Sequence, residues 1–198
     1  MQTIFIAISS ILVLISPIVY SIAILKGKAK PHRTTRLVLL IITGLTTASL
    51  FAQHNTVAIW LAGASTLQSM VIFILSIKHG MGGWSKFDIF CLIIALAGII
   101  LWQLTKNPVI GLYFAIGADF TGMIPALIKT YRFPYTEVWT FFLLDTIAAG
   151  FSLLALRSWT LQEYSYPFYI LVINLCMVIL IIRPNFSINN SVKRHSGK

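Results

Sequence analysis

Long apolar runs separated by short polar turns are the feature that most constrains the fold of this chain. Seven runs approach the roughly 20 residues that a helix needs to cross a bilayer: 3–25, 36–53, 57–77, 87–104, 108–128, 138–156 and 165–182. Inside lipid each run must satisfy its own backbone hydrogen bonds, which favours a helix. The sequence therefore predicts an all-α membrane protein with seven transmembrane helices.

The composition agrees with a membrane protein. The chain has 198 residues, of which 58% are hydrophobic and 10% are charged, whereas a soluble domain carries about 25% charged residues. A net charge of +10 also occurs in nucleic-acid-binding proteins, but there lysine and arginine gather on a folded polar face. Here they stand in short clusters between apolar runs, so we expect a lipid bilayer and no nucleic acid as the partner.

The basic residues predict the orientation of the helices. If the N-terminus lies outside, thirteen lysines and arginines fall on the inner side, and only Lys106 and Arg157 fall on the outer side. Cytoplasmic loops are enriched in these residues. We therefore expect a cytoplasmic C-terminus and a location in the plasma membrane or a bacterial inner membrane.

A short internal repeat divides the runs. Lys26 ends the first run and Pro31 follows five residues later, and Lys129 and Pro134 stand in the same relation after the fifth run. Two three-helix units share an orientation only if an odd number of helices separates them. The sequence thus predicts a first three-helix repeat (1–78), a cytoplasmic loop with an inverting fourth helix (79–106), a second parallel repeat (107–184) and a cytoplasmic tail (185–198).

This three-one-three order resembles that of the SWEET and PQ-loop superfamily of small transporters. Pro17, Ile22 and the turn at residues 26–28 are similar to the family's first-helix pattern, and Asn174 lies where SWEET proteins carry a substrate-contacting Asn. The chain has no Pro-Gln dipeptide. Vitamin transporters of the nicotinamide-riboside type resemble the same layout. The resemblance implies a transporter for a small polar solute, of the sugar, amino acid or vitamin class, that works by rocking of its two repeats.

Polar residues inside the runs are the candidates for substrate binding: Asp119, Asp145, Asn174, Gln68 and Ser69. Ionisable residues are costly in a bilayer and usually face the bundle interior or a cavity. Small residues stand at helical spacing beside each Asp, so we expect both carboxylates to point inward. A proton or cation site is the functional interpretation. Structural hydrogen bonds between helices, or a pair with Arg157, are the alternative.

Pro17 and Pro125 lie inside runs, at roughly matching places of the two repeats. A proline within a helix removes a backbone hydrogen bond and kinks the helix, so both are predicted hinges, with a static bend as the alternative.

The sequence offers little for catalysis. It has neither a nucleophile beside a base nor a cluster of His, Cys, Asp and Glu with metal-ligand spacing, so we expect no enzyme, no cofactor and no metal. The competing interpretation of the same helical plan is a receptor, scaffold or assembly protein that transports nothing. A homo-oligomer is compatible with both functions.

Overall fold

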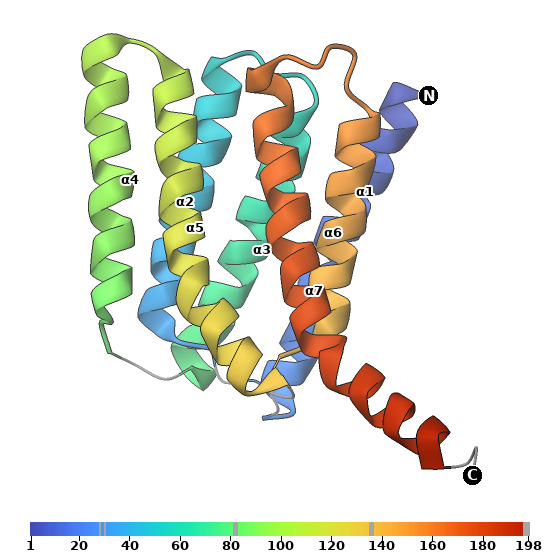
Figure 1. The fold of residues 1–198 in the computed structure, drawn as a ribbon. Coiled ribbons are helices and arrows are strands. Elements are labelled where there is room, and N and C mark those ends of the chain that lie inside the picture. Colours follow the sequence, from blue (N-terminus) through green and yellow to red (C-terminus); the bar gives the residue numbers. More distant parts are fainter. Residues whose placement is uncertain (28, 30, 81–82, 135–136, 196–198) are drawn as a thin grey trace.

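The structure, a computed structural model, describes residues 1–27, 29, 31–80, 83–134 and 137–195, with side chains through Arg183. Within these residues the elements are all helical (Figure 1): α1 (Gln2–Leu25), α2 (Arg33–Ala52), α3 (Ala58–His79), α4 (Lys86–Thr105), α5 (Pro108–Arg132), α6 (Trp139–Leu154) and α7 (Leu161–His195). The prediction of an all-α protein is confirmed.

The length and hydropathy of each helix indicate whether it can cross a membrane. Six of the described helices, α1 to α5 and the Leu161–Arg183 part of α7, are long and apolar enough to cross a membrane. These six candidates support a multi-pass membrane protein. Helix α6 is apolar but has 16 residues, which is about 24 Å at 1.5 Å per residue. The count of seven spans therefore stays a prediction.

Local capping explains where several helices begin. Ser85 and Asp88 form a capping box at the start of α4, in which each side chain accepts a hydrogen bond from the other residue's backbone N–H. Asn107 caps α5 and places Pro108 at its first position, where a proline's missing N–H costs nothing. The side chain of Asn55 accepts hydrogen bonds from the backbone of Val57 and Ala58 as α3 begins.

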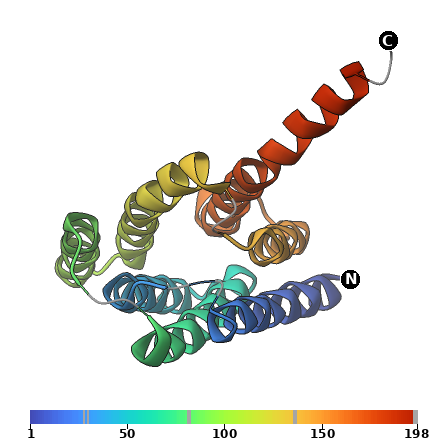
Figure 2. The ribbon, with the colours of Figure 1, turned by 90° about the horizontal axis from the view of Figure 1, so that it is seen from below.

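The helices pack as two groups of three, seen end-on in Figure 2. In the first group α3 contacts both α1 and α2, and in the second α7 contacts both α5 and α6. The groups meet where α1 packs against α6 and α2 packs against α5, and α3 also touches α6 and α7. Helix α4 lies at the edge, against α5 and α2.

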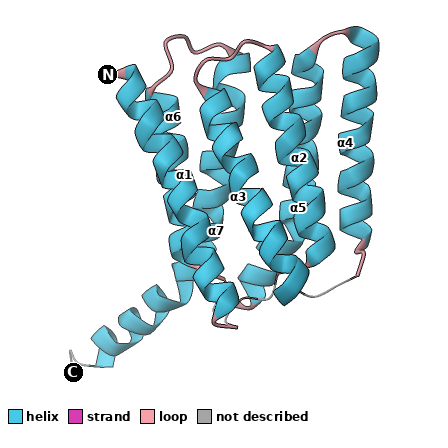
Figure 3. Cartoon of the chain, turned by 180° about the vertical axis from the view of Figure 1, so that it is seen from behind, coloured by secondary structure: helices cyan, strands magenta, loops and turns pink. Residues whose placement is uncertain are grey.

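The two ends of the bundle differ in charge, and the turns at both ends are visible in Figure 3. We call the end where α1, α3 and α5 finish the basic end, because it carries Lys26, Arg33, Lys78, Lys86, Lys129, Arg132 and Arg183. The opposite end carries Lys106 and Arg157.

A buried apolar cluster lies toward the opposite end and joins both groups. It includes Val13 of α1, Leu50 of α2, Leu61 of α3, Leu112 of α5 and Ala148 of α6, all at most 1% exposed. We call it the apolar seal. Because it contains residues of both groups, it closes the interface between them on that side.

Candidate functional site

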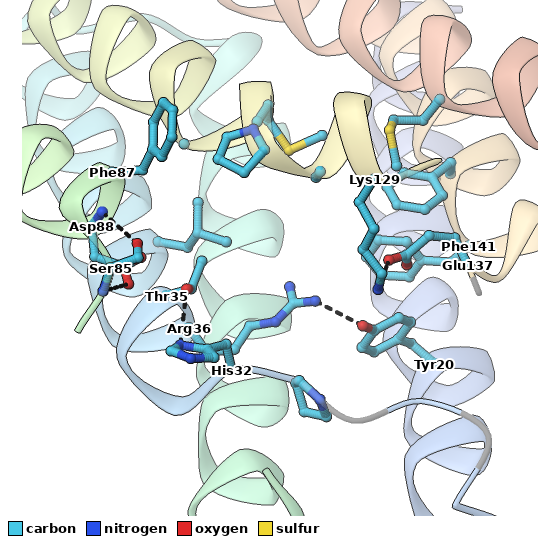
Figure 4. Close-up of a pocket in the computed structure, with 18 residues that line it drawn as sticks. Tyr20, His32, Thr35, Arg36, Ser85, Phe87, Asp88, Lys129, Glu137 and Phe141 are labelled. Carbon is cyan, nitrogen blue, oxygen red and sulfur yellow. Dashed lines mark hydrogen bonds and ion pairs between the residues drawn. The ribbon is translucent and has the colours of Figure 1, made fainter. Parts of the chain in front are cut away.

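Two cavities lie inside the bundle and share four lining residues, Arg36, Leu39, Met123 and Phe141. The larger, of about 390 Å³, lies at the basic end between the start of α2 and the end of α5 (Figure 4). We call it the vestibule. The smaller, of about 110 Å³, lies deeper in the bundle, and we call it the central cavity. The two cavities therefore adjoin at these four residues.

The structure brings together all the side chains that the sequence nominates for substrate binding. The central cavity is lined by Gln68, Ser69, Asp119, Asp145 and Asn174, which come from α3, α5, α6 and α7. Both acidic residues thus line the interior of the bundle, as expected. That these residues bind a solute remains a prediction.

Asp145 of α6 is hydrogen-bonded to Ser16 of α1 and Gln68 of α3, and we call these three residues the Asp145 joint because they connect the two groups of helices. Its side chain is buried, and residue Asp145 is 7% exposed. Ser16 Oγ donates to Oδ1 (2.7 Å) and Gln68 Nε2 donates to Oδ2 (3.0 Å). Both carboxylate oxygens therefore have donors, one from α1 and one from α3. Arg157, the partner considered from the sequence, instead donates to Gln2 Oε1 (2.5 Å).

Asp119 is held less completely. Tyr169 OH, from α7, donates to its Oδ2 (2.5 Å), and no described residue donates to its Oδ1. The residue is half-buried and lines the central cavity from α5. Among the described residues, Oδ1 of Asp119 is thus an acceptor without a donor.

Arg36 lines both cavities but is not among the residues that the sequence nominates, because there it counts only as a charge that fixes topology. Its Nη2 donates to Tyr20 OH (2.9 Å), and its guanidinium lies 5.0 Å from the centre of the Tyr20 ring. It is half-buried and lines both cavities. The available signal was its place one turn inside α2, on the same face as Leu39 and Thr43.

The other charged groups of the vestibule have partners. Lys129 Nζ and Glu137 Oε1 form an ion pair at 3.0 Å, and the Asp88 carboxylate accepts from the backbone N–H of Ser85 at 3.0 Å. Among the described residues, no carboxylate lies within ion-pair distance of Arg36. Among the described residues that line the two cavities, Arg36 is therefore a cation without an ion-pair partner.

The two predicted hinges lie in different surroundings. Pro125 of α5 lines the vestibule, whereas Pro17 of α1 is buried. Pro17 leaves the Val13 carbonyl without its helical N–H donor, and the Ser16 hydroxyl lies 3.2 Å from that oxygen. Ser16 therefore connects the proline of α1 with the Asp145 joint. Whether either helix moves at its proline stays a prediction.

No set of three or more His, Cys, Asp and Glu side chains suited to a metal ion occurs in the part of the chain that the structure describes. The chain matches no family model, and neither curated proteins nor solved structures show a significant similarity to it.

Proposed function

We propose that this protein carries a small polar solute across a membrane by alternating access to the central cavity. The observation that carries the proposal is the cavity itself, which is lined by Asp119 and Asp145 and by the amides Gln68 and Asn174. Binding sites of transporters lie near the bilayer midplane, between structural repeats. A buried carboxylate is costly in lipid, so its place in a cavity suits a solute or water that offsets the cost.

We take the two groups of helices as parallel repeats, 1–78 and 107–184, with α4 as the inverting helix and α6 as the seventh span. Their packing supports this assignment. The first helix of one group meets the second helix of the other in both pairings, α1 with α6 and α2 with α5. A two-fold axis along the membrane normal would produce this reciprocity. The resemblance to the PQ-loop plan rests on the same order.

The proposed orientation follows from the charge. Because cytoplasmic ends are rich in lysine and arginine, we place the basic end in the cytoplasm of a plasma or bacterial inner membrane. The vestibule then opens inward, and the apolar seal closes the outer side. Transport requires a second state in which the seal parts and the vestibule closes. Pro125, in the vestibule wall, is where α5 would bend during that change.

The competing function, a scaffold or receptor, would be favoured by a bundle interior packed shut with apolar side chains. The interior instead keeps a cavity of about 110 Å³ with five polar nominated residues around it. A scaffold needs no such cavity, and buried polar groups around it are costly unless they are paired.

Uptake into proteoliposomes tests the proposal. The purified chain is reconstituted and screened with labelled sugars, amino acids and vitamins, beside the variants Asp119→Asn and Gly117→Ala. Gly117 is the matched control, because a methyl group there meets nothing within 4 Å. We expect at least one solute to accumulate, with Asp119→Asn abolishing uptake and Gly117→Ala preserving it. A folded chain that moves none of these solutes would overturn transport.

A further inference from the structure

We infer that the solute is a small zwitterion, whose carboxylate binds Arg36 and whose ammonium group binds Asp119. The inference rests on the proposed transport function and names the chemistry of its substrate. Both residues line the same central cavity, and each offers an unused half of an ion pair.

Arg36 has unused N–H donors that suit an anion. A guanidinium has five N–H donors in a planar fork that matches a carboxylate, and the one donation to a described residue goes to Tyr20 OH. The Tyr20 ring also lies against the guanidinium, which favours a fixed orientation. The remaining N–H donors of Arg36 are therefore available to a ligand at the wall of the central cavity.

Asp119 has a carboxylate oxygen, without a donor among the described residues, that suits a cation. Tyr169 fixes one carboxylate oxygen by its hydrogen bond, and the other oxygen has no donor among the described residues. Asn174, on the same cavity wall, donates its amide N–H to Ile170 O at 2.8 Å. This leaves the Asn174 carbonyl oxygen as a second acceptor for an ammonium group.

The two charges do not neutralise each other. Asp119 and Arg36 line one cavity but form no ion pair with each other, since the pair found in the described part of the chain joins Lys129 and Glu137. Partly desolvated charges without partners are costly. A zwitterion compensates both at once, whereas a sugar compensates neither and a simple cation leaves Arg36 unpaired.

The cavity volume limits the size of the solute. About 110 Å³ is well below the roughly 300–1,000 Å³ of pockets for drug-sized ligands. A solute with few heavy atoms, in which the ammonium and carboxylate groups stand close together, fits this volume.

Binding to matched probes tests the inference on the full chain in lipid nanodiscs. The probes are glycine, alanine, serine, β-alanine and 4-aminobutyrate, each beside its amide, which is a cation, and its N-acetyl derivative, which is an anion. We expect at least one zwitterion to bind more than tenfold tighter than both of its derivatives. One lost charge-assisted hydrogen-bond pair corresponds to about 10- to 100-fold in Kd.

Variants assign the two charges. Arg36→Gln should remove the preference for the zwitterion over its amide, and Asp119→Asn should remove the preference over the N-acetyl derivative. Arg36→Lys keeps the charge without the fork and should weaken binding but retain the preference. Arg132→Gln is the control, because it removes a charge at the basic end from an exposed residue that lines neither cavity. Helicity by circular dichroism confirms that each variant is folded.

The outcomes separate the inference from the proposed function. Uptake of a sugar or a vitamin without binding of any zwitterion overturns the inference and leaves transport standing. Binding of a zwitterion without its uptake into proteoliposomes overturns transport and leaves the binding site. Preferences that persist in both Arg36→Gln and Asp119→Asn overturn the assignment of these residues.

Discussion

Replacing Asp145 by Asn should lower the stability of the helical bundle whether or not a solute is present. The carboxylate accepts from Ser16 at one oxygen and from Gln68 at the other. An amide offers one oxygen, and its NH2 group faces a donor on the other side. Interhelical hydrogen bonds in membranes contribute about 0.6 kcal/mol on average and about 1.7 kcal/mol at most. Because the acceptor is a buried carboxylate, we expect a loss of about 1.5 kcal/mol.

A mutant cycle around the joint sharpens this expectation. Ser16→Ala and Gln68→Met each remove one donor and should each cost about 1 kcal/mol. The double variant leaves the carboxylate without a described donor, so its cost should exceed the sum by at least about 0.5 kcal/mol. Adding Asp145→Leu should then recover stability, because an apolar set leaves no polar group unpaired.

Equilibrium unfolding in mixed micelles, with rising SDS mole fraction and far-UV circular dichroism as the signal, measures these changes. Asp119→Asn is the matched control, since its single described donor, Tyr169, can keep a carbonyl acceptor. We expect this variant within about 0.5 kcal/mol of the parent. If Asp145→Asn is equally silent and the double variant is additive, the joint does not stabilise the bundle. Asp145 would then belong with Asp119 as a residue that binds solute.

The remaining predictions concern packing, topology and motion. Gly98→Ala should cost about 1–3 kcal/mol of unfolding free energy, because its new Cβ would lie 2.5 Å from Phe114 Cβ. Gly117→Ala should instead stabilise α5 by up to about 1 kcal/mol. Equal effects of the two variants in the SDS assay would contradict the α4–α5 packing. The orientation is tested by changing the exposed residues Lys26 and Ser158, one at a time, to Cys in a chain that carries Cys91→Ala and Cys176→Ala. In intact cells, an impermeant maleimide should label one of these two positions and not the other. Labelling of both from the same side would refute the proposed orientation. Pro125→Ala should slow uptake severalfold, because α5 without the proline resists bending. Solute affinity should stay within about twofold, because Pro125 does not line the central cavity. Unchanged uptake would assign Pro125 to a static bend.

The helices were largely predictable because their cause is local. An apolar run in lipid has one way to satisfy its backbone, and the run 3–25 corresponds to α1 at Gln2–Leu25. The end of α7 was not found, since the run stops at residue 182 while the helix continues to His195. Apolarity marks the part of a helix that suits lipid, and helical hydrogen bonding continues where the sequence becomes polar.

The candidate site was predictable only in part. Polar residues inside apolar runs stand out by their cost, and all five nominated residues line the central cavity. Arg36 stood at the edge of a run, where a positive charge has an ordinary explanation in topology. Ser16 and Tyr169 were missed because hydroxyl groups are common in membrane helices. Only the packing of α1 on α6 and of α5 on α7 brings these hydroxyls to the carboxylates.

The proposed repeat gives a physical reason for the unequal roles of the two acids. Lys26 and Lys129 are 103 residues apart, as are Pro31 and Pro134. With the same offset, Asp119 occupies the repeat position equivalent to Ser16, and Asp145 the position equivalent to Ile42. At the α1–α6 contact, the equivalent positions hold a hydroxyl and an acid that bond to each other.

At the α2–α5 contact the same two positions hold Ile42 and Asp119. Ile42 is 1% exposed and packs in a cluster with Ala115 and Ala118 of α5, so it offers Asp119 no donor from the other group. Asp119 takes its one described donor from Tyr169 within its own group, and the residue lines the central cavity. A carboxylate that bridges the groups opposes their separation, whereas one that stays unbridged can bind a solute without holding the groups together. Under the proposed transport function, we therefore expect the bundle to open at the α2–α5 contact. The vestibule lies beside this contact, between the start of α2 and the end of α5.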